Sequence, residues 1–181
     1  MDDKLIWFLI VGILLVIMFF FNRKVRLFAL VKEQLLVFKN DKKKKISFWD
    51  ILCFFVFPMV VAIILVYKLD FIIDDNLANL LTAVFSVVFT VLFGFAAIMI
   101  SKIDSQNNIE KQVAEETFVS IVSSTILALV SAILSIVLTQ VDSDICLKII
   151  SASILFLSLI IIMLTLMITK RTFFLYVKHK K

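Results

Sequence analysis

The sequence has little of what small-molecule and metal chemistry in proteins requires. Its 181 residues include only two glycines, two cysteines and one histidine. No Gly-rich phosphate-binding loop, Cys-x-x-Cys pair or His-Glu-x-x-His motif occurs. Cys53 and Cys146 fall in different segments and His179 lies in a basic tail, so neither a disulfide framework nor a metal site is indicated. We therefore expect no catalytic residues, no metal ligands and no cofactor, and interpret the protein as not an enzyme.

Charged residues are also scarce, at 18% of the chain, whereas hydrophobic residues make up 62%. A soluble domain averages about 25% charged and about 45–50% apolar residues, and cannot hide so much apolar surface. Five apolar runs contain no ionisable side chain at all; they cover residues 5–21, 51–67, 80–100, 118–139 and 149–169. Because ionisable groups within the bilayer mark proton relays, voltage sensors and ion-coupled transporters, their absence disfavours these functions.

These runs predict an all-α integral membrane protein with five transmembrane helices, since each has about the 17–25 residues that a spanning helix needs. Run 5–21 is followed by basic residues and not by a signal-peptide cleavage site. It is therefore interpreted as a retained helix, either one of five transmembrane helices or an anchor beside a four-helix bundle. Pro58 falls inside the second run and predicts a kink there. The expected divisions are an N-terminal transmembrane helix (1–22), a basic cytoplasmic helical loop (23–50), transmembrane helices 2–5 (51–170) with a cytoplasmic extension at about 105–118, and a basic cytoplasmic tail (171–181).

The distribution of cations predicts the orientation. If all five runs span the membrane, sixteen of the nineteen lysines and arginines lie on one side, and only Lys4, Lys68 and Lys148 lie on the other. Because positive charge favours the cytoplasmic side, the amino terminus is predicted outside and the carboxyl terminus inside. This topology also accounts for the net charge of +5, so we expect no direct binding of nucleic acid.

Two cytoplasmic stretches are expected to be helical. Between residues 25 and 38, five apolar side chains share one helical face: Leu27, Phe28, Val31, Leu35 and Phe38. This helix would either continue the first span or lie on the membrane surface. From Asn107 onward, a helix start signal precedes Glu110, Glu115 and Glu116, so an acidic cytoplasmic helix is expected to lead into the fourth span.

Two stripes of small residues recur at three- and four-residue spacing in the third and fourth spans. They are Ala83, Ser86, Thr90, Gly94 and Ala97 in the third, and Ser120, Ser124, Ala128, Ser131 and Ser135 in the fourth. Small residues let helix backbones approach closely, and hydroxyls can hydrogen-bond across to a neighbouring helix. The stripes are therefore either helix-packing faces within one chain, an oligomer interface, or the lining of a narrow hydrated pore.

Basic residues crowd the stretch between the first two runs, including Arg23, Lys24, Arg26, Lys42, Lys43, Lys44 and Lys45. Phe48 and Trp49 follow this cluster, as aromatic anchors do at a membrane interface. The cluster is thus either a topological anchor or a contact for anionic lipid or an acidic cytosolic partner. Each lysine near a charged surface contributes about 1 kcal/mol to such docking.

Residues 111–125, Lys-Gln-Val-Ala-Glu-Glu-Thr-Phe-Val-Ser-Ile-Val-Ser-Ser-Thr, combine an acidic cytoplasmic helix with a Ser-rich span. This layout resembles small multi-span membrane proteins of bacterial phage-defence islands, in particular the KwaA membrane subunits of the Kiwa system. The resemblance implies a homo-oligomer in the bacterial inner membrane that holds a cytosolic effector protein and responds to infection. A non-enzymatic scaffold that recruits or signals to such an effector is the function we expect. The alternatives are a pore-forming effector or ion channel, and a small solute transporter.

Overall fold

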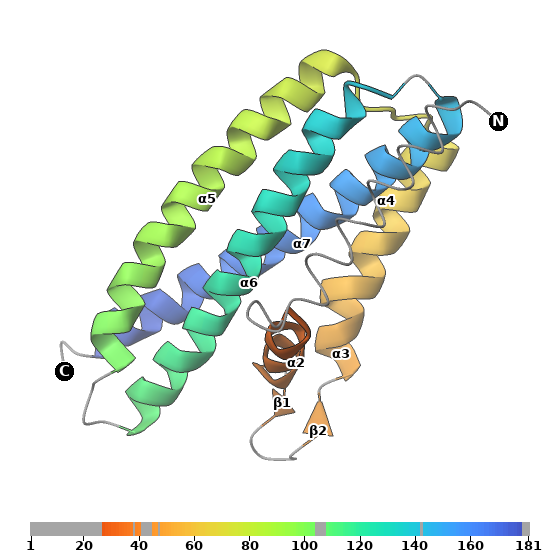
Figure 1. Ribbon diagram of the computed structural model, residues 1–181. Coiled ribbons are helices and arrows are strands. Elements are labelled where there is room, and N and C mark those ends of the chain that lie inside the picture. The colour runs from red at the N-terminus through yellow and green to blue at the C-terminus, as the bar shows by residue number, and fades with distance from the viewer. Residues whose placement is uncertain are drawn as a thin grey trace.

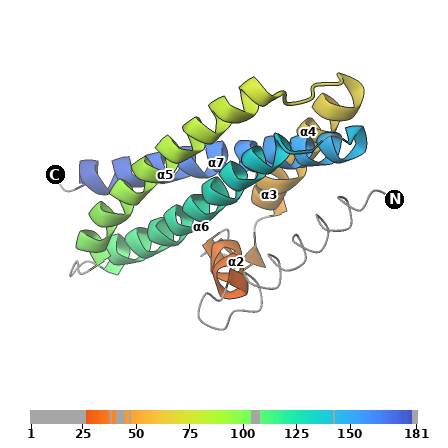
Figure 2. The same ribbon diagram turned by 45° about the horizontal axis from the view of Figure 1, so that its top comes forward.

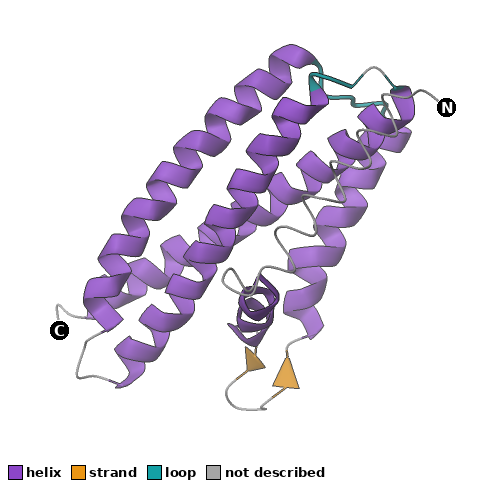
Figure 3. Ribbon diagram, viewed as in Figure 1, coloured by secondary structure: helices purple, strands orange, loops and turns teal. Residues whose placement is uncertain are grey.

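The computed structural model describes residues 27–37, 39–40, 45–46, 48–103, 108–141 and 143–178, and these form an almost entirely helical protein (Figures 1 and 3). The long helices are α4 (Phe57–Lys68), α5 (Asp75–Ile103), α6 (Asn108–Leu138) and α7 (Asp144–Lys178). Before them come α2 (Leu27–Val37), β1 (Lys39–Asn40), β2 (Lys45–Ile46), α3 (Phe48–Ile51) and the π-helix η1 (Leu52–Val56). The two short strands pair antiparallel, with Lys39 opposite Ile46.

Four helical segments are long and apolar enough to cross a membrane: Trp49–Lys68, Asp75–Ile100, Glu110–Leu138 and Asp144–Leu175. They contain the second to fifth predicted runs, except Thr139 at the end of the fourth, so the chain is a multi-pass membrane protein. The first predicted span, residues 5–21, lies outside the described residues, and the fifth helix stays a prediction. α6 begins at Asn108, ten residues before its apolar run, which confirms the predicted helical extension ahead of that span.

Helices α5, α6 and α7 form a three-helix core in which α6 packs against both neighbours (Figure 1). One cluster joins Phe85 of α5, Ala128 of α6 and Ile154 of α7, and a second cluster joins the same helices nearer the other end of the bundle. Eight of the nine α6 residues described as buried alternate three and four positions apart: Ala114, Thr117, Ile121, Ser124, Ala128, Ser131, Ser135 and Leu138. The ninth is Ser120, next to Ile121. This heptad spacing is that of a left-handed coiled coil, and the small side chains let the helices approach closely.

Helix α4 lies at the edge of this core and packs against α7. It contributes a narrow seam of Pro58, Ala62 and Val66, while its other apolar side chains, except the half-buried Leu65, are exposed and available to lipid. The predicted distortion at Pro58 takes the form of the π-helix η1, in which the Phe57 N–H bonds to the carbonyl of Leu52. The wider π-turn relieves the clash between a proline ring and the carbonyl four residues earlier.

One end of the bundle is closed by two short connections, residues 69–74 and 139–143 (Figure 1). Asp70 has a φ of 47°, a left-handed conformation that aspartate tolerates better than most residues, and it ends α4. Its carboxylate lies 2.7 Å from the ammonium of Lys148 at the start of α7. The backbone N–H of Ile73 donates to the hydroxyl of Ser151, 3.3 Å away. These contacts fasten the connection between α4 and α5 onto α7.

At the other end, α2 lies across the long helices and packs against α6 (Figure 2). Within α2, Gln34 is buried, and Leu30 and Val37 on the same side are half-buried. Val31, from the predicted apolar face, is 54% exposed instead. Helical periodicity identifies an apolar face but does not tell which part of a helix packs against the rest of the chain, so it did not predict the exposure of Val31.

The predicted orientation can be tested with the two native cysteines. Cys146 lies in the first turn of α7 at the end predicted to be outside, whereas Cys53 lies in η1 at the opposite end. A maleimide that cannot cross the inner membrane should label Cys146 in spheroplasts and spare Cys53. Cys146→Ser and Cys53→Ser variants identify which thiol reacts. Labelling of Cys53 alone, with Cys146 reactive only after permeabilisation, would reverse the orientation.

Candidate functional site

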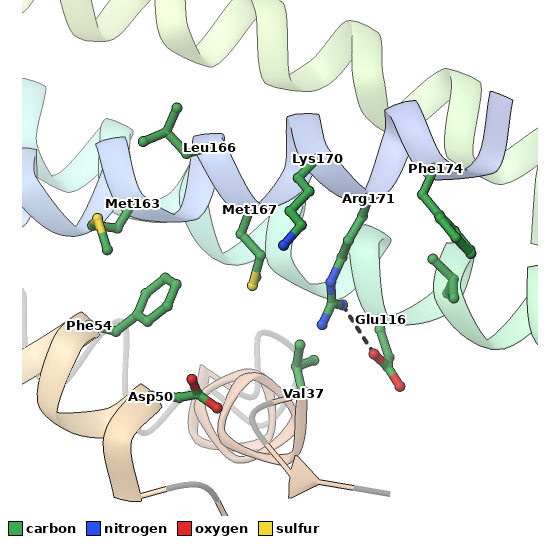
Figure 4. A pocket seen from close by; sticks show the side chains of 11 residues that line it. Val37, Asp50, Phe54, Glu116, Met163, Leu166, Met167, Lys170, Arg171 and Phe174 are labelled. Atoms are coloured by element: carbon green, nitrogen blue, oxygen red, sulfur yellow. Dashed lines mark ion pairs between the residues drawn. The ribbon is translucent and has the colours of Figure 1, made fainter. Parts of the chain in front are cut away.

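A cavity of about 670 Å³ opens at the end of the bundle that is predicted to face the cytoplasm, between α2, α3, η1, α6 and α7 (Figure 4). One part of its wall is apolar, with Phe54 of η1 facing Met163 and Met167 of α7, while Leu166 lines the rim. The other part is charged and contains Asp50, Glu116, Lys170 and Arg171. Lys170 is the first charged residue after the apolar run of α7, so the cavity crosses from the hydrocarbon level to the predicted cytoplasmic interface.

An ion pair between α6 and α7 forms one wall of this cavity. Arg171 Nη1 lies 3.1 Å from Glu116 Oε2, close enough for charge attraction although not aligned as a hydrogen bond. The other carboxylate oxygen of Glu116 accepts a hydrogen bond of 3.0 Å from the side-chain amide of Gln112. Within the described part of the chain, neither Lys170 nor Asp50 forms an ion pair. The cavity therefore presents one paired cation and one unpaired cation beside an unpaired carboxylate.

The other predicted acidic residues lie along the first turns of α6. Glu115 is exposed and Glu110 is half-buried, and Glu116 forms its ion pair with Arg171 of α7. The basic residues Arg23, Lys24, Arg26, Lys42, Lys43 and Lys44 lie outside the described residues. Lys45 is placed by its backbone in β2, so the predicted partner or anionic-lipid contact at this basic cluster stays a prediction.

The small residues of α6 lie inside the chain. Ser120, Ser124, Ala128, Ser131 and Ser135 are all fully buried. Contrary to the expectation, their hydroxyls do not bond to neighbouring helices. Those of Ser120, Ser124 and Ser135 donate to carbonyls four residues earlier in α6, and that of Ser131 has no hydrogen-bond partner among the described residues. A hydroxyl that donates to a carbonyl of the preceding turn is not available for a hydrogen bond to another helix. Close packing is therefore the main interaction that holds α6 against α5 and α7.

The small residues of α5 lie on the outside. Ala83, Ser86, Thr90, Gly94 and Ala97 are all exposed, and a Cβ added at Gly94 would meet no atom within 4 Å. The hydroxyls of Ser86 and Thr90 donate to carbonyls four residues earlier, at 2.8 and 3.0 Å. This outward stripe, which we call the α5 small-residue face, is uncovered by the rest of the described chain and carries no unsatisfied hydroxyl at those two positions.

The cavity and the heptads were not predicted from the sequence. The heptad signal is nevertheless visible in α7, where small and β-branched residues alternate three and four positions apart: Ser151, Ile154, Ser158, Ile161, Thr165, Ile168 and Thr172. The cavity has no comparable signal, because Asp50, Glu116 and Lys170 belong to three segments that only the packing brings together. Comparison of the chain with family models, with curated proteins and with solved structures finds no match.

Proposed function

We propose that the protein is a non-enzymatic subunit of a bacterial inner membrane that self-associates through the α5 small-residue face and recruits or signals to a cytosolic effector, in antiviral defence. The defence role rests on the resemblance of residues 107–140 to membrane subunits of phage-defence islands. Self-association is supported by the outward position of the α5 small-residue face.

The supporting observation is the contrast between the two stripes. Both have the spacing that lets helix backbones approach closely, but the α6 stripe is already covered by α5 and α7. The α5 stripe, with Gly94 near its middle, faces outward. Lipid tails gain little from contact with a flat small-residue surface, whereas a second helix gains close packing there. A second copy of α5 is the occupant that this face fits.

The inner end offers a surface for a soluble partner. In α2, Val31 and Leu36 are 54% and 49% exposed, and Lys32 and Glu33 between them are exposed as well. α2 is held to the bundle by α6, so this surface is attached to the transmembrane core. A partner bound to α2 would therefore sense a rearrangement of α6, which also packs against α5 and α7.

A pore is the second candidate, supported by the exposed hydroxyls of Ser86 and Thr90. In a ring of subunits, these hydroxyls would line a central channel if α5 faced the axis. Conductance across liposomes that contain the purified protein distinguishes this function from a scaffold. A channel that closes when Thr90 is changed to leucine would favour the pore.

We expect the double substitution Val31→Asp with Leu36→Asp to abolish effector recruitment without altering membrane insertion. Apolar anchors at the centre of an interface contribute most of its binding energy, and burial of two carboxylates there is unfavourable. The measurement is affinity capture from the native host after cross-linking, with phage plaque counts as a second readout. Lys111→Gln, a change on the exposed surface of α6, is the control. Wild-type capture and protection by the double variant would exclude α2 as the docking surface.

A further inference from the structure

The charges that line the inner cavity balance one another. Arg171 is paired with Glu116, whereas Lys170 and Asp50 have no ion-pair partner within the described residues. In Figure 4 the side chains of Lys170 and Arg171 extend from α7 toward the space that Asp50 faces from α3. An anion alone would satisfy Lys170 and leave Asp50 opposed to it. A ligand with both a negative and a positive group satisfies both.

The apolar wall of the same cavity continues from these charges into the membrane. Met163 and Met167, four residues apart on α7, face Phe54, and Leu166 lies beside them at the edge of this wall. Leu166 is 62% exposed, so this wall opens laterally toward lipid rather than only toward water. The cavity volume of about 670 Å³ is within the range of roughly 300–1,000 Å³ in which small ligands bind.

We propose that this cavity binds one inner-leaflet phospholipid with a primary ammonium headgroup, such as a phosphatidylethanolamine. Its phosphate is bound by Lys170 with Arg171 beside it, its ammonium by Asp50, and one acyl chain lies along Met163 and Met167 against Phe54. An ammonium with three N–H donors hydrogen-bonds to the Asp50 carboxylate, which the quaternary ammonium of a phosphatidylcholine cannot do. A phosphatidylglycerol has no cation for Asp50. The bound lipid would join α3 and η1 to α7, which is independent of self-association at α5.

The test is native mass spectrometry of the delipidated full-length protein titrated with phosphatidylethanolamine, phosphatidylcholine and phosphatidylglycerol of identical acyl chains. We expect phosphatidylethanolamine to bind about tenfold or more tightly than the other two, because one charge-assisted hydrogen bond contributes about 1.5–3 kcal/mol. Equal binding of all three lipids would overturn the proposal. Equally effective binding of glycerophosphoethanolamine, which lacks acyl chains, would also overturn it.

Variants locate the site. Lys170→Gln and Asp50→Asn should each weaken phosphatidylethanolamine binding about tenfold, to the level of phosphatidylcholine. Lys111→Gln and Glu115→Gln remove charges from the exposed surface of α6 and should leave binding unchanged. Met163→Trp should fill the apolar part and weaken all three lipids, whereas Ile162→Trp, on the exposed side of α7, should not. Unchanged phosphatidylethanolamine binding in Lys170→Gln, Asp50→Asn and Met163→Trp would place the lipid elsewhere.

Discussion

Replacing Ser124 with leucine is expected to destabilise the protein severely, by about 1–3 kcal/mol from overpacking alone. Ser124 is fully buried at a heptad position of α6, between α5 and α7. Its neighbours along the seam, Ser120 and Ala128, are equally buried, so the added atoms have no space to enter without separating the helices. The expected result is a lower melting temperature in detergent and a lower yield of inserted protein.

Two control variants separate volume from polarity. Ser124→Ala removes a hydroxyl that bonds only to its own helix, so its effect should be small. Thr169→Leu adds a comparable apolar side chain at an exposed position of α7 and should be tolerated. If Ser124→Leu were as stable as Thr169→Leu, the close packing of α5, α6 and α7 would be wrong.

Replacing Thr90 with tryptophan should dissociate the assembly while leaving the single chain folded. Thr90 lies next to Gly94 on the α5 small-residue face and is exposed in the single chain. A large ring there would hold two copies of α5 apart, at a cost comparable to overpacking of a core, or about 10- to 100-fold in the dissociation constant. The measurement is the particle mass in mild detergent, together with the melting temperature.

Val91→Trp is the matched control, because Val91 is also exposed but lies about 100° away around the helix. It should assemble normally, since its side chain contacts lipid. Gly94→Ala provides a second comparison: in a single chain it should stabilise the helix by about 0.5–1 kcal/mol, whereas in an assembly it should weaken the contact. If Thr90→Trp and Val91→Trp assembled equally well, the α5 small-residue face would not be the interface.

The sequence was sufficient to predict four of the helices, because long uncharged apolar runs have few other structures open to them in a membrane. It was not sufficient to tell the two stripes apart. Ser124 and Gly94 have the same spacing of small neighbours, yet one is buried and the other exposed. The reason lies in α5, which faces α6 with large side chains such as Phe85, Leu92 and Met99. The small residues of α6 pack against large residues of α5. The spacing of small residues in α5 therefore does not identify the face of α5 that contacts α6.

The contact of α2 with α6 and the inner cavity depend on tertiary packing that periodicity does not encode. The predicted helix at residues 25–38 was confirmed over Leu27–Val37, but the side that meets α6 carries Gln34 rather than Val31. A polar side chain on a buried face contradicts the usual pattern of an amphipathic helix. The Glu116–Arg171 pair likewise joins residues far apart in the sequence. Neither contact leaves a local signal in the sequence.

The most direct test of self-association through α5 is the mass of the wild-type particle in lipid nanodiscs, corrected for lipid and scaffold protein. One chain has a mass of 20.8 kDa. We predict that the wild-type particle contains two or more chains. The Thr90→Trp variant should give a particle with a single chain, whereas the Val91→Trp variant should keep the wild-type number. A wild-type particle of 20.8 kDa at every protein concentration would contradict the proposal.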